Sequence, residues 1–341
     1  MTKTAVVILN WNGQKFLEKF LPSVTSLSTA AGTEVWVADN GSTDNSISFL
    51  RQNYPQVHII RFSQNYGFTG GYNKALAQIE AKYFVLLNSD VEVTANWLEP
   101  LVDYMDSNLD VAACMPKILA YNNKTQFEYA GAAGGFIDKY GFPFCRGRIL
   151  GSIEPDTGQY NNTCDIFWAT GACMLVRCNV YNSLGGLDAD FFAHMEEIDL
   201  CWRMKNQGYR IVIIPKSTVY HVGGGTLPNN NPHKLFLNYR NNLFMLYKNL
   251  PKKKFHRNLL KRMILDGLSV AMYLLQFNFK FAWAVPRAHL DFYRNLKLLQ
   301  AKRQALQNAR KVEYHNERYK HSIVFDYYLR HIKKFSQLKK W

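Results

Sequence analysis

The sequence lacks the cysteine patterns of a metal-binding or redox module. None of its six cysteines forms a C-x-x-C pair or pairs closely with a histidine, which argues against a zinc site and a thioredoxin-type motif. It also lacks a secretory signal, because the first apolar run, residues 5–9, is shorter than a signal-peptide core. We therefore expect reduced cysteines that serve as packing residues, and a protein of the cytoplasm.

No apolar segment is long enough to cross a membrane. The most apolar stretch, residues 263–285, is interrupted by Asp266 and Lys280. The longest uncharged run within it, residues 267–279, has 13 residues, whereas a transmembrane helix needs about 20. Of the 341 residues, 48% are hydrophobic and 20% are charged, an ordinary globular composition that excludes a disordered or collagen-like chain.

Positive charge is concentrated at one end of the chain. Residues 234–341 contain 24 Lys and Arg against 5 Asp and Glu, a net charge of +19, whereas residues 1–233 carry a net −4. The two parts therefore meet different surroundings. We divide the chain into a first domain, residues 1–233, and a basic, aromatic, helical extension, residues 234–341.

The extension contains an apolar, aromatic-rich stretch with basic residues on both sides, from Lys252 to Arg287. This pattern predicts a helix in the interface of an anionic membrane leaflet. The alternative is that these helices pack on the first domain and only expose their lysines. Nucleic-acid binding is another alternative, but no RNA- or DNA-binding motif accompanies the charge. We expect a membrane surface as partner and no nucleic acid.

Short apolar runs rich in β-branched residues recur in the first quarter of the chain, each followed by a segment of helix length, such as residues 46–52 and 74–81. This order predicts an α/β fold with a mostly parallel sheet flanked by helices, whose ligands bind beyond the carboxyl ends of the strands. Residues 115–165 are irregular and predict connecting loops with a few short strands. The four runs are residues 5–9, 34–38, 58–62 and 83–87.

Small polar residues follow each predicted strand. Asp39 is placed to accept hydrogen bonds from a nucleobase or ribose, although an aspartate in a turn is the plainer interpretation. Asn88, Ser89 and Asp90 offer oxygens to a divalent cation and substrate phosphates, or else form a turn. The glycine-rich residues 65–73 bring backbone amides toward a phosphate or ribose, but they lack the G-K-[ST] of a P-loop.

Three carboxylates open a predicted helix at residues 195–206, where the helix dipole favours anions. Asp199 and Arg203 have the i,i+4 spacing of a structural ion pair. Glu196 or Glu197 is then left to face the cleft, where it can take a proton from an attacking hydroxyl. A solvated acidic first turn is the alternative.

Two further features bear on the class of protein. His221 follows the strand predicted at residues 210–214 and is either a metal ligand or an ordinary histidine of the core or surface. No G-x-G-x-x-G follows the first strand, which argues against an oxidoreductase that binds a dinucleotide.

Taken together, these segments resemble glycosyltransferase family 2 in kind and in order over roughly residues 4–250. The resemblance is to the branch that includes bacterial rhamnosyltransferases and galactofuranosyltransferases, which build cell-surface polysaccharides. The matching segments are residues 6–12, 37–44, 65–73, 86–90, 170–172, 185–188 and 196–203, together with His221.

The resemblance implies a GT-A fold for residues 1–233 and an inverting transfer of a hexosyl or deoxyhexosyl group. The implied donor is a dTDP- or UDP-sugar, the acceptor is a glycan or an oligosaccharide on a polyprenyl diphosphate, and the cofactor is Mg²⁺ or Mn²⁺. The protein would then work as a peripheral protein on the inner face of the cell membrane.

The resemblance also assigns roles to matched positions. Glu197 is the general base, supported by Glu196, Asp199 and Arg203. The metal ligands are Asp90 and Asn88, at the family's D-x-D place, and His221. The nucleotide-sugar site comprises Asn10, Asn12, Asp39, Asn65, Gly67, Asn73, Asn88 and Ser89. The acceptor site comprises Trp168, Thr170, Gly171 and His194.

The chain departs from the family pattern at Asn88, which stands where the family has an aspartate. The metal site therefore has one negative charge fewer than a full D-x-D. This departure leaves open a catalytically silent, nucleotide-sugar-binding module of the same fold.

Overall fold

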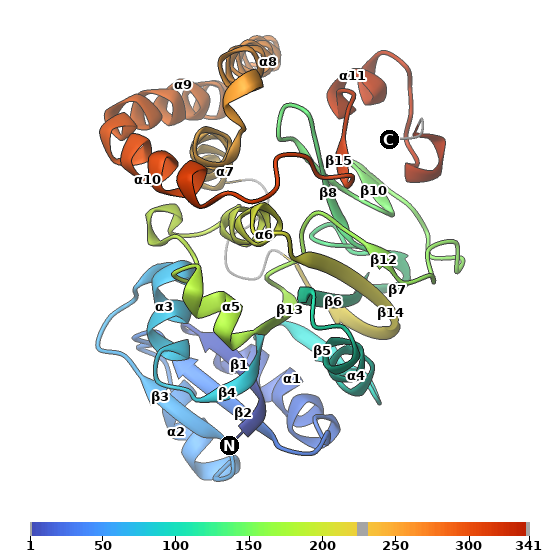
Figure 1. Ribbon diagram of the computed structural model, residues 1–341. Coiled ribbons are helices and arrows are strands. Elements are labelled where there is room, and N and C mark those ends of the chain that lie inside the picture. The colour runs from blue at the N-terminus through green and yellow to red at the C-terminus, as the bar shows by residue number, and fades with distance from the viewer. Residues whose placement is uncertain (1, 224–230, 339–341) are drawn as a thin grey trace.

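A ten-stranded mixed sheet forms the centre of the protein (Figure 1). The computed structural model describes residues 2–223 and 231–338. The strands of this sheet are β1 (Thr2–Asn10), β2 (Thr33–Asp39), β3 (His58–Arg61), β4 (Ala81–Asn88), β5 (Val91–Val93), β6 (Val111–Ala120), β7 (Asn123–Phe127), β12 (Cys164–Asp165), β13 (Cys173–Arg177) and β14 (Arg210–His221). Their order is β12-β14-β6-β13-β4-β1-β2-β3, with β5 beside β14 and β7 beside β6.

The four strands expected from the apolar runs are present and parallel, since β1 pairs with β2 and β4, and β2 pairs with β3. In β4, residues 83–87 are all fully buried, as in strands covered on both faces. The expected parallel arrangement also holds for β6 with β14. By contrast, β13 lies antiparallel between β4 and β6, and the chain reaches it from β12 of the same sheet without a helix between the two strands.

Six helices of the first domain flank this sheet: α1 (Gln14–Leu27), α2 (Ser46–Asn53), α3 (Gly67–Leu76), α4 (Glu99–Ser107), α5 (Cys178–Ser183) and α6 (Glu196–Asn206). The helices expected at residues 46–52 and 195–206 are confirmed. The helix expected at residues 74–81 is wrong, because α3 begins at Gly67 and ends at Leu76. Tyr72 is fully buried and its hydroxyl donates to the Leu87 carbonyl at 3.0 Å, so packing on the sheet outweighs the low helix propensity of the glycines.

Part of the irregular region builds a second, five-stranded sheet. Its strands are β8 (Gly135–Asp138), β9 (Pro143–Cys145), β10 (Arg148–Ile149), β11 (Ser152–Ile153) and β15 (Arg318–Tyr319). The order is β11-β10-β9-β8-β15. Strands of two to four residues are too short to leave a periodic pattern in the sequence. β15 belongs to the basic extension and pairs in parallel with β8 of the first domain.

The extension is largely helical, as expected, and lies against the first domain (Figure 1). Lys248 of α7, only 1% exposed, forms ion pairs with Asp188 and Asp199. A single hydrophobic core contains residues of both parts, so the division at residue 233 follows composition and stays a prediction as a domain boundary. The helices of the extension are α7 (Pro232–Asn249), α8 (Phe255–Leu275), α9 (Phe279–Arg294), α10 (Leu296–Ala309) and α11 (Ile323–Tyr328), with the 3-10 turns η2 (Lys252–Lys254) and η3 (Phe335–Gln337). A further 3-10 turn, η1 (Ala189–Phe191), lies in the first domain.

The apolar stretch of the extension does not form one continuous helix. Residues 263–285 form the end of α8 and the start of α9, with a break at residues 276–278. Within residues 2–223 and 231–338, no helix has both the length and the apolar character that a membrane span requires.

Candidate active site

The carboxyl ends of β1, β2 and β4 meet at one edge of the sheet, as the parallel arrangement predicts. In the strand register Asn10 lies beside Asp39, and its neighbour Leu9 lies beside Asn88. The Asn10 amide donates to an Asp39 carboxylate oxygen at 3.1 Å and to Ser42 Oγ at 3.2 Å. Asp39 is fully buried and also accepts from the Ser42 backbone N–H at 3.1 Å, as the turn interpretation predicts.

Other predicted donor-site residues hold the loops around this edge. Asn12, in a left-handed conformation with φ 50°, accepts from the Thr43 backbone N–H at 2.7 Å. Asn65 accepts from the Asn40 amide at 3.0 Å and from the Gly67 N–H at 2.8 Å. Ser89 lies at the end of β4, facing Gly13. These contacts give the polar edge a defined shape.

Gly67 and Asn73 both connect α3 to the chain that precedes α6. Gly67 has φ 72°, and a Cβ there would lie 2.5 Å from the Phe192 ring, so both the backbone angle and the space require glycine. Asn73 donates to the Leu187 carbonyl at 2.7 Å and accepts from the Tyr181 hydroxyl at 2.7 Å. The Asn73 side chain is thus engaged by the protein itself.

Asp90 and His221 form a buried pair of candidate metal ligands. The Val222 N–H bonds to the Asp90 carbonyl, and β14 pairs with β5 so that His221 lies beside Val91. The Asp90 carboxylate oxygen and His221 Nε2 are 3.2 Å apart. The Asn88 amide nitrogen lies 3.5 Å from the same His221 nitrogen. The three predicted metal ligands are therefore brought together.

Glu128 joins this group, although sequence reasoning missed it. Its carboxylate lies 3.5 Å from His221 Nδ1, on the opposite side of the ring from Asp90. Burial alone would lower the pKa of His221, but the hydrogen bonds and charges of Asp90 and Glu128 outweigh it and raise that pKa to about 10. Glu128 lies in the irregular region, where no sequence pattern marked it. The Glu128 carboxylate adds one negative charge to the site, where Asn88 carries none in place of the family's aspartate.

The donor set of this pair fits a divalent cation. Two adjacent ligands of an octahedral ion, each bound at about 2.1 Å, are about 3 Å apart, close to the separation of the Asp90 oxygen and the His221 nitrogen. Among the residues that the structure describes, no group of three or more His, Cys, Asp or Glu could hold an ion unaided. The remaining positions would therefore belong to substrate phosphates and water, as is common for Mg²⁺.

Glu196 and Glu197 begin α6, and each has a buried carboxylate oxygen with no hydrogen-bond partner in the described structure. Burial raises the pKa of Glu197 to about 7, against the lowering effect of backbone N–H groups. Burial and the neighbouring charge of Glu197 raise the pKa of Glu196 as well. The Glu197 side chain starts beside Gly171, with its Cβ 3.9 Å from where a Cβ on Gly171 would stand. Such a carboxylate is suited to accept a proton near neutral pH.

Asp199 and Arg203 form the ion pair that their spacing predicts, with Arg203 Nε donating to Asp199 at 2.9 Å. Arg203 also donates to the carbonyls of Leu184 and Gly186 at 2.8 and 2.7 Å. The Asn249 amide donates to the other Asp199 oxygen at 2.7 Å. These contacts hold α6 in place, and with it the backbone position of Glu197.

The predicted acceptor residues occupy different surroundings. Trp168 is 3% exposed, packs against Gly135 and donates to the Phe136 carbonyl, so its ring is part of the core, and its role in acceptor binding stays a prediction. Thr170 is also buried and caps its own turn by accepting from the Ala172 N–H. Trp168 is covered by β8 of the second sheet, which the sequence did not reveal, and Thr170 packs beside Gly131.

His194 and the residues around it form a strained loop before α6. Phe192, His194 and Met195 all have positive φ, between 63° and 71°. The buried Nε2 of His194 has no partner in the described structure. Burial, with the charges of Lys234 and His233, lowers the pKa of His194 to about 4, so this ring is neutral at pH 7.

Asn241 of α7 holds this loop and was also missed by sequence reasoning. Its amide donates to the backbone carbonyls of Phe191, Ala193 and His194 at 2.9, 2.8 and 2.8 Å. Arg240 donates to the carbonyls of Asp190 and Phe191 as well. The basic extension therefore positions the loop that leads into α6.

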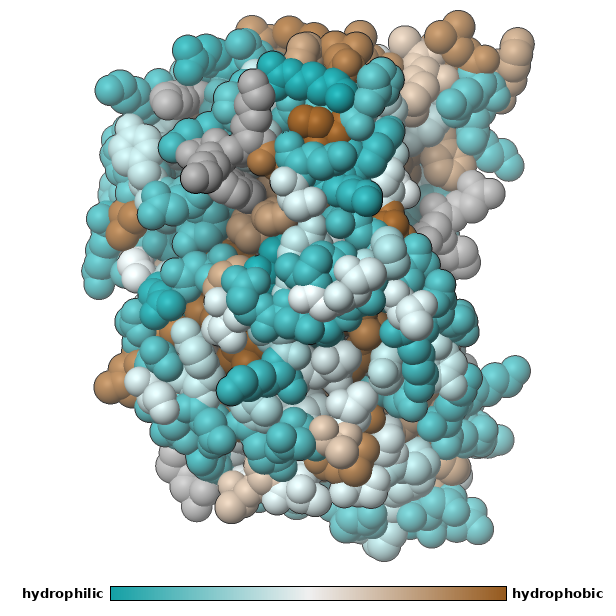
Figure 2. All heavy atoms as spheres, turned by 90° about the vertical axis from the view of Figure 1, so that its right-hand side faces the viewer, coloured by the Kyte–Doolittle hydropathy of each residue, from teal (hydrophilic) through white to brown (hydrophobic). Residues whose placement is uncertain are grey.

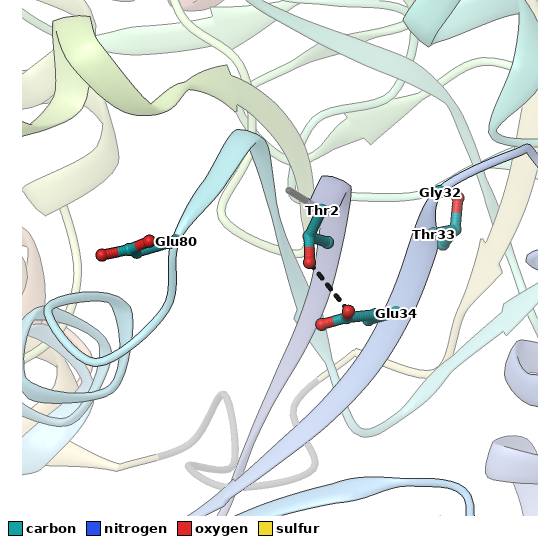
Figure 3. A pocket seen from close by; sticks show the side chains of 5 residues that line it. All are labelled: Thr2, Gly32, Thr33, Glu34 and Glu80. Atoms are coloured by element: carbon teal, nitrogen blue, oxygen red, sulfur yellow. Dashed lines mark hydrogen bonds between the residues drawn. The ribbon is translucent and has the colours of Figure 1, made fainter.

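A separate hollow lies at the other edge of the sheet (Figure 3). It is lined by Thr2, Gly32, Thr33, Glu34 and Glu80, at the amino ends of the strands. Thr2 donates to Glu34 at 2.7 Å. None of the predicted site residues contributes to this hollow, which is remote from the carboxyl ends where they gather.

The mixed sheet has a parallel core, with polar residues gathered at the carboxyl ends of its strands and two glutamates at the start of α6. This architecture is that of a glycosyltransferase of the GT-A class. Residues 5–185 match the family described as Glycosyl transferase family 2. This chain belongs to that family.

Comparison with known proteins agrees with this assignment. The chain is 27% identical over 249 residues to N-acetylglucosaminyl-diphospho-decaprenol L-rhamnosyltransferase of Mycobacterium tuberculosis, covering 63% of this chain and 75% of that protein. This similarity supports the rhamnosyltransferase-like branch.

Two solved structures share the fold. A mannosyltransferase from Pyrobaculum calidifontis in complex with GDP-Man and Mn²⁺ is 13% identical, with a TM-score of 0.54 and coverage of 85% of this chain and 87% of that one. S. aureus TarS 1-349 in complex with UDP is 15% identical, with a TM-score of 0.53 and coverage of 90% and 89%. At these identities the similarity concerns the fold.

Proposed function

We propose that this protein is an inverting glycosyltransferase that moves a hexosyl or deoxyhexosyl group from a dTDP- or UDP-sugar to a hydroxyl of a lipid-linked oligosaccharide. The observation that carries the proposal is the buried Glu197 Oε2, which has no hydrogen-bond partner in the described structure, on a carboxyl whose pKa is raised to about 7. The Glu197 side chain begins beside Gly171, and the next residue, Ala172, accepts a hydrogen bond from the Asn88 N–H at 3.0 Å. The Asn88 amide in turn lies 3.5 Å from His221, the partner of Asp90. Glu197 is suited to take a proton, and the pair of Asp90 and His221 is suited to bind a cation.

In the proposed reaction, Glu197 removes the proton of the acceptor hydroxyl as its oxygen attacks the anomeric carbon. The new C–O bond forms on the face opposite the departing diphosphate, so the configuration is inverted in one step. The bond to the diphosphate oxygen breaks, and the nucleoside diphosphate leaves with that electron pair. General-base catalysis of this kind contributes typically ~10²- to 10⁴-fold.

Asp90 and His221 would hold Mg²⁺ or Mn²⁺, with Asn88 beside them. The bound ion supplies a positive charge that stabilises the departing diphosphate. Asp39 and Asn10, which bond to each other, form the floor of the nucleoside site in this proposal. Support for a nucleoside-diphosphate donor comes from the GDP-Man and UDP complexes of the structural neighbours.

The proposed acceptor is a glycan on a polyprenyl diphosphate, used in polysaccharide synthesis for the cell surface. The named substrate of the mycobacterial relative, a diphospho-decaprenol, supports this choice. A lipid-borne acceptor places the enzyme peripherally on the inner face of the cell membrane.

The test uses the full chain with a panel of dTDP- and UDP-sugars, Mn²⁺ and a polyprenyl-diphosphate acceptor, with the product anomer read by NMR. We expect Glu197→Gln to bind the donor with unchanged affinity in calorimetry while turnover falls at least 100-fold. Glu196→Gln is the matched control and is expected to keep more activity. Donor binding without transfer by the wild type would favour the silent module.

A further inference from the structure

One side of α8 carries exposed apolar residues at helical spacing. Leu260, Ile264, Leu268 and Met272 recur every four residues and are 61, 57, 63 and 38% exposed. Leu275, at the end of the helix, is 81% exposed. The other side of α8 packs on the protein. A line of exposed apolar side chains on the outer side is typical of a surface that binds a partner.

The apolar line continues through the turn into α9, where Phe277, Phe279 and Trp283 are 81, 63 and 59% exposed. Figure 2 shows hydrophobic residues gathered along the top edge of the molecule, the edge where Figure 1 places α8. We call this surface the apolar ridge. Its residues are Leu260, Ile264, Leu268, Met272, Leu275, Phe277, Phe279 and Trp283.

The charges around the apolar ridge are of one sign. Asp266 is the single acidic residue between positions 252 and 290, and it is 1% exposed and paired with Arg262 and His289. The exposed ionisable side chains beside the ridge are thus basic. They include Lys252, Lys253, Arg257, Lys261, Lys280 and Arg287.

The opposite side of α8 is fixed to the protein by specific contacts. The Arg262 guanidinium lies 3.9 Å from the Phe142 ring centroid, and it also bonds to Asn242 of α7. The Tyr239 hydroxyl donates to Ser269 at 2.7 Å. Polar groups therefore anchor the inner side of α8, while the outer side presents apolar groups to the surroundings.

Helix α8 is joined to the candidate active site through α7. The Tyr239 hydroxyl of α7 donates to Ser269 of α8 at 2.7 Å, and Asn241, two residues further along α7, holds the loop in front of α6. The helix that carries the apolar ridge is therefore tied by α7 to the loop that leads into the candidate site.

We propose that the apolar ridge enters the headgroup region of an anionic lipid leaflet and turns the active site toward it. Apolar residues flanked only by lysine and arginine complement a surface that is negatively charged outside and apolar beneath. The proposal deepens the proposed function by naming the surface that meets the membrane, and it rests on that function for the lipid-linked acceptor.

The first test is flotation of the full-length protein with vesicles of phosphatidylcholine alone or with 30% phosphatidylglycerol. We expect retention on the anionic vesicles, with at least tenfold weaker partitioning for Leu268→Glu/Leu275→Glu. Leu109→Glu is the matched control, since Leu109 is 76% exposed in the first domain. All these side chains are exposed, so circular dichroism and thermal melting should stay unchanged.

A charge-reversed pair tests the electrostatic part. Lys253→Glu/Lys261→Glu is expected to weaken partitioning at least fivefold, because each basic residue near a leaflet contributes about that factor. Lys15→Glu/Lys216→Glu, at exposed positions outside the extension, should change little. If Leu268→Glu/Leu275→Glu and Lys253→Glu/Lys261→Glu both bind anionic vesicles as strongly as the wild type, the proposal is wrong.

Two further measurements separate this proposal from its alternatives. If sedimentation shows a dimer that Leu268→Glu/Leu275→Glu dissociates while vesicle binding is unchanged, the ridge joins two copies and the proposal is wrong. In transfer assays, the ridge variant should match the wild type with a water-soluble acceptor and lose activity with an acceptor in vesicles. If the wild type binds vesicles but transfers sugar to neither acceptor, the proposed function is wrong. The proposal that the apolar ridge binds the membrane is then still supported.

Discussion

The side-chain amide of Asn241 donates a hydrogen bond to the backbone carbonyl of His194 at 2.8 Å. This bond joins the basic extension to the strained loop in front of α6. Met195, which follows His194, is itself left-handed and precedes the two glutamates of the candidate site. A loop in this strained conformation persists only when its surroundings hold it, and Asn241 supplies three of the bonds that do so.

Asn241→Ala is expected to lower kcat by about 10- to 100-fold, because a small displacement of a catalytic group has effects of this size. The Michaelis constant for the donor should change little, since the Asn10 and Asp39 edge is untouched. Steady-state kinetics with circular dichroism as a check on folding give the answer. Asn53→Ala removes a similar bond to a carbonyl on the exposed α2 helix and serves as the control. A larger effect on the Michaelis constant than on kcat would contradict this role.

Glu128 is expected to support metal binding through His221. A carboxylate on the second nitrogen of a ligating histidine orients its ring, and removal of such a partner typically costs 10- to 100-fold in metal affinity. Glu128→Gln should therefore weaken Mn²⁺ binding by about that factor, measured by electron paramagnetic resonance with UDP present. Asp90→Asn should weaken it further, whereas Glu92→Gln, nearby on β5, should not. Equal Mn²⁺ affinity in Glu128→Gln and wild type would rule the support out.

Much of the fold and part of the site could be predicted because their signals are local. The apolar runs that became β1 to β4 are buried on both faces, and the polar residues at their ends meet because neighbouring parallel strands end at the same edge. The Asp199 and Arg203 pair follows from helical spacing alone. In each case a few consecutive residues carry the information.

Glu128, Asn241 and the burial of Trp168 depend on contacts between distant segments. Glu128 reaches His221 across 93 positions of the chain, and Asn241 reaches His194 across 47. Trp168 is covered by β8, a strand too short to show a period. Such contacts depend on tertiary packing, and a single sequence contains no local pattern that reports them.

Lys248→Met is expected to destabilise the protein by about 1.5–3 kcal/mol, because Asp188 and Asp199 both lose a buried cation and keep only Lys302 and Arg203, respectively. Burial alone would raise the pKa of Asp188, but Lys248 and Lys302 hold it well below its ordinary value. Urea unfolding measures the loss. Lys302→Met is the matched control, since Lys302 is more exposed and its loss should cost less. Equal losses would mean that burial does not set the strength of these pairs.

The raised pKa of Glu197 predicts a pH dependence of both rate and stability. A general base must be deprotonated, so kcat/KM should fall about tenfold for each pH unit below 7 and level off above it. The contribution of Glu197 to the free energy of unfolding changes with pH in the opposite direction. The native state holds the Glu197 proton more tightly than the unfolded chain, whose glutamate has a pKa near 4.5, so this contribution is present below pH 4.5 and is lost as pH rises through 7.

Glu197→Gln separates these two effects in one protein. It cannot carry the negative charge that burial disfavours, so its free energy of unfolding should exceed that of the wild type at pH 8 and approach it at pH 5. Its residual transfer rate should also lose the inflection near pH 7. Chemical denaturation at both pH values and a pH profile of kcat/KM provide the measurements. If the inflection persists in Glu197→Gln and disappears in Glu196→Gln, the neighbouring glutamate is the base, because the two carboxylates share one buried site and either can hold the proton.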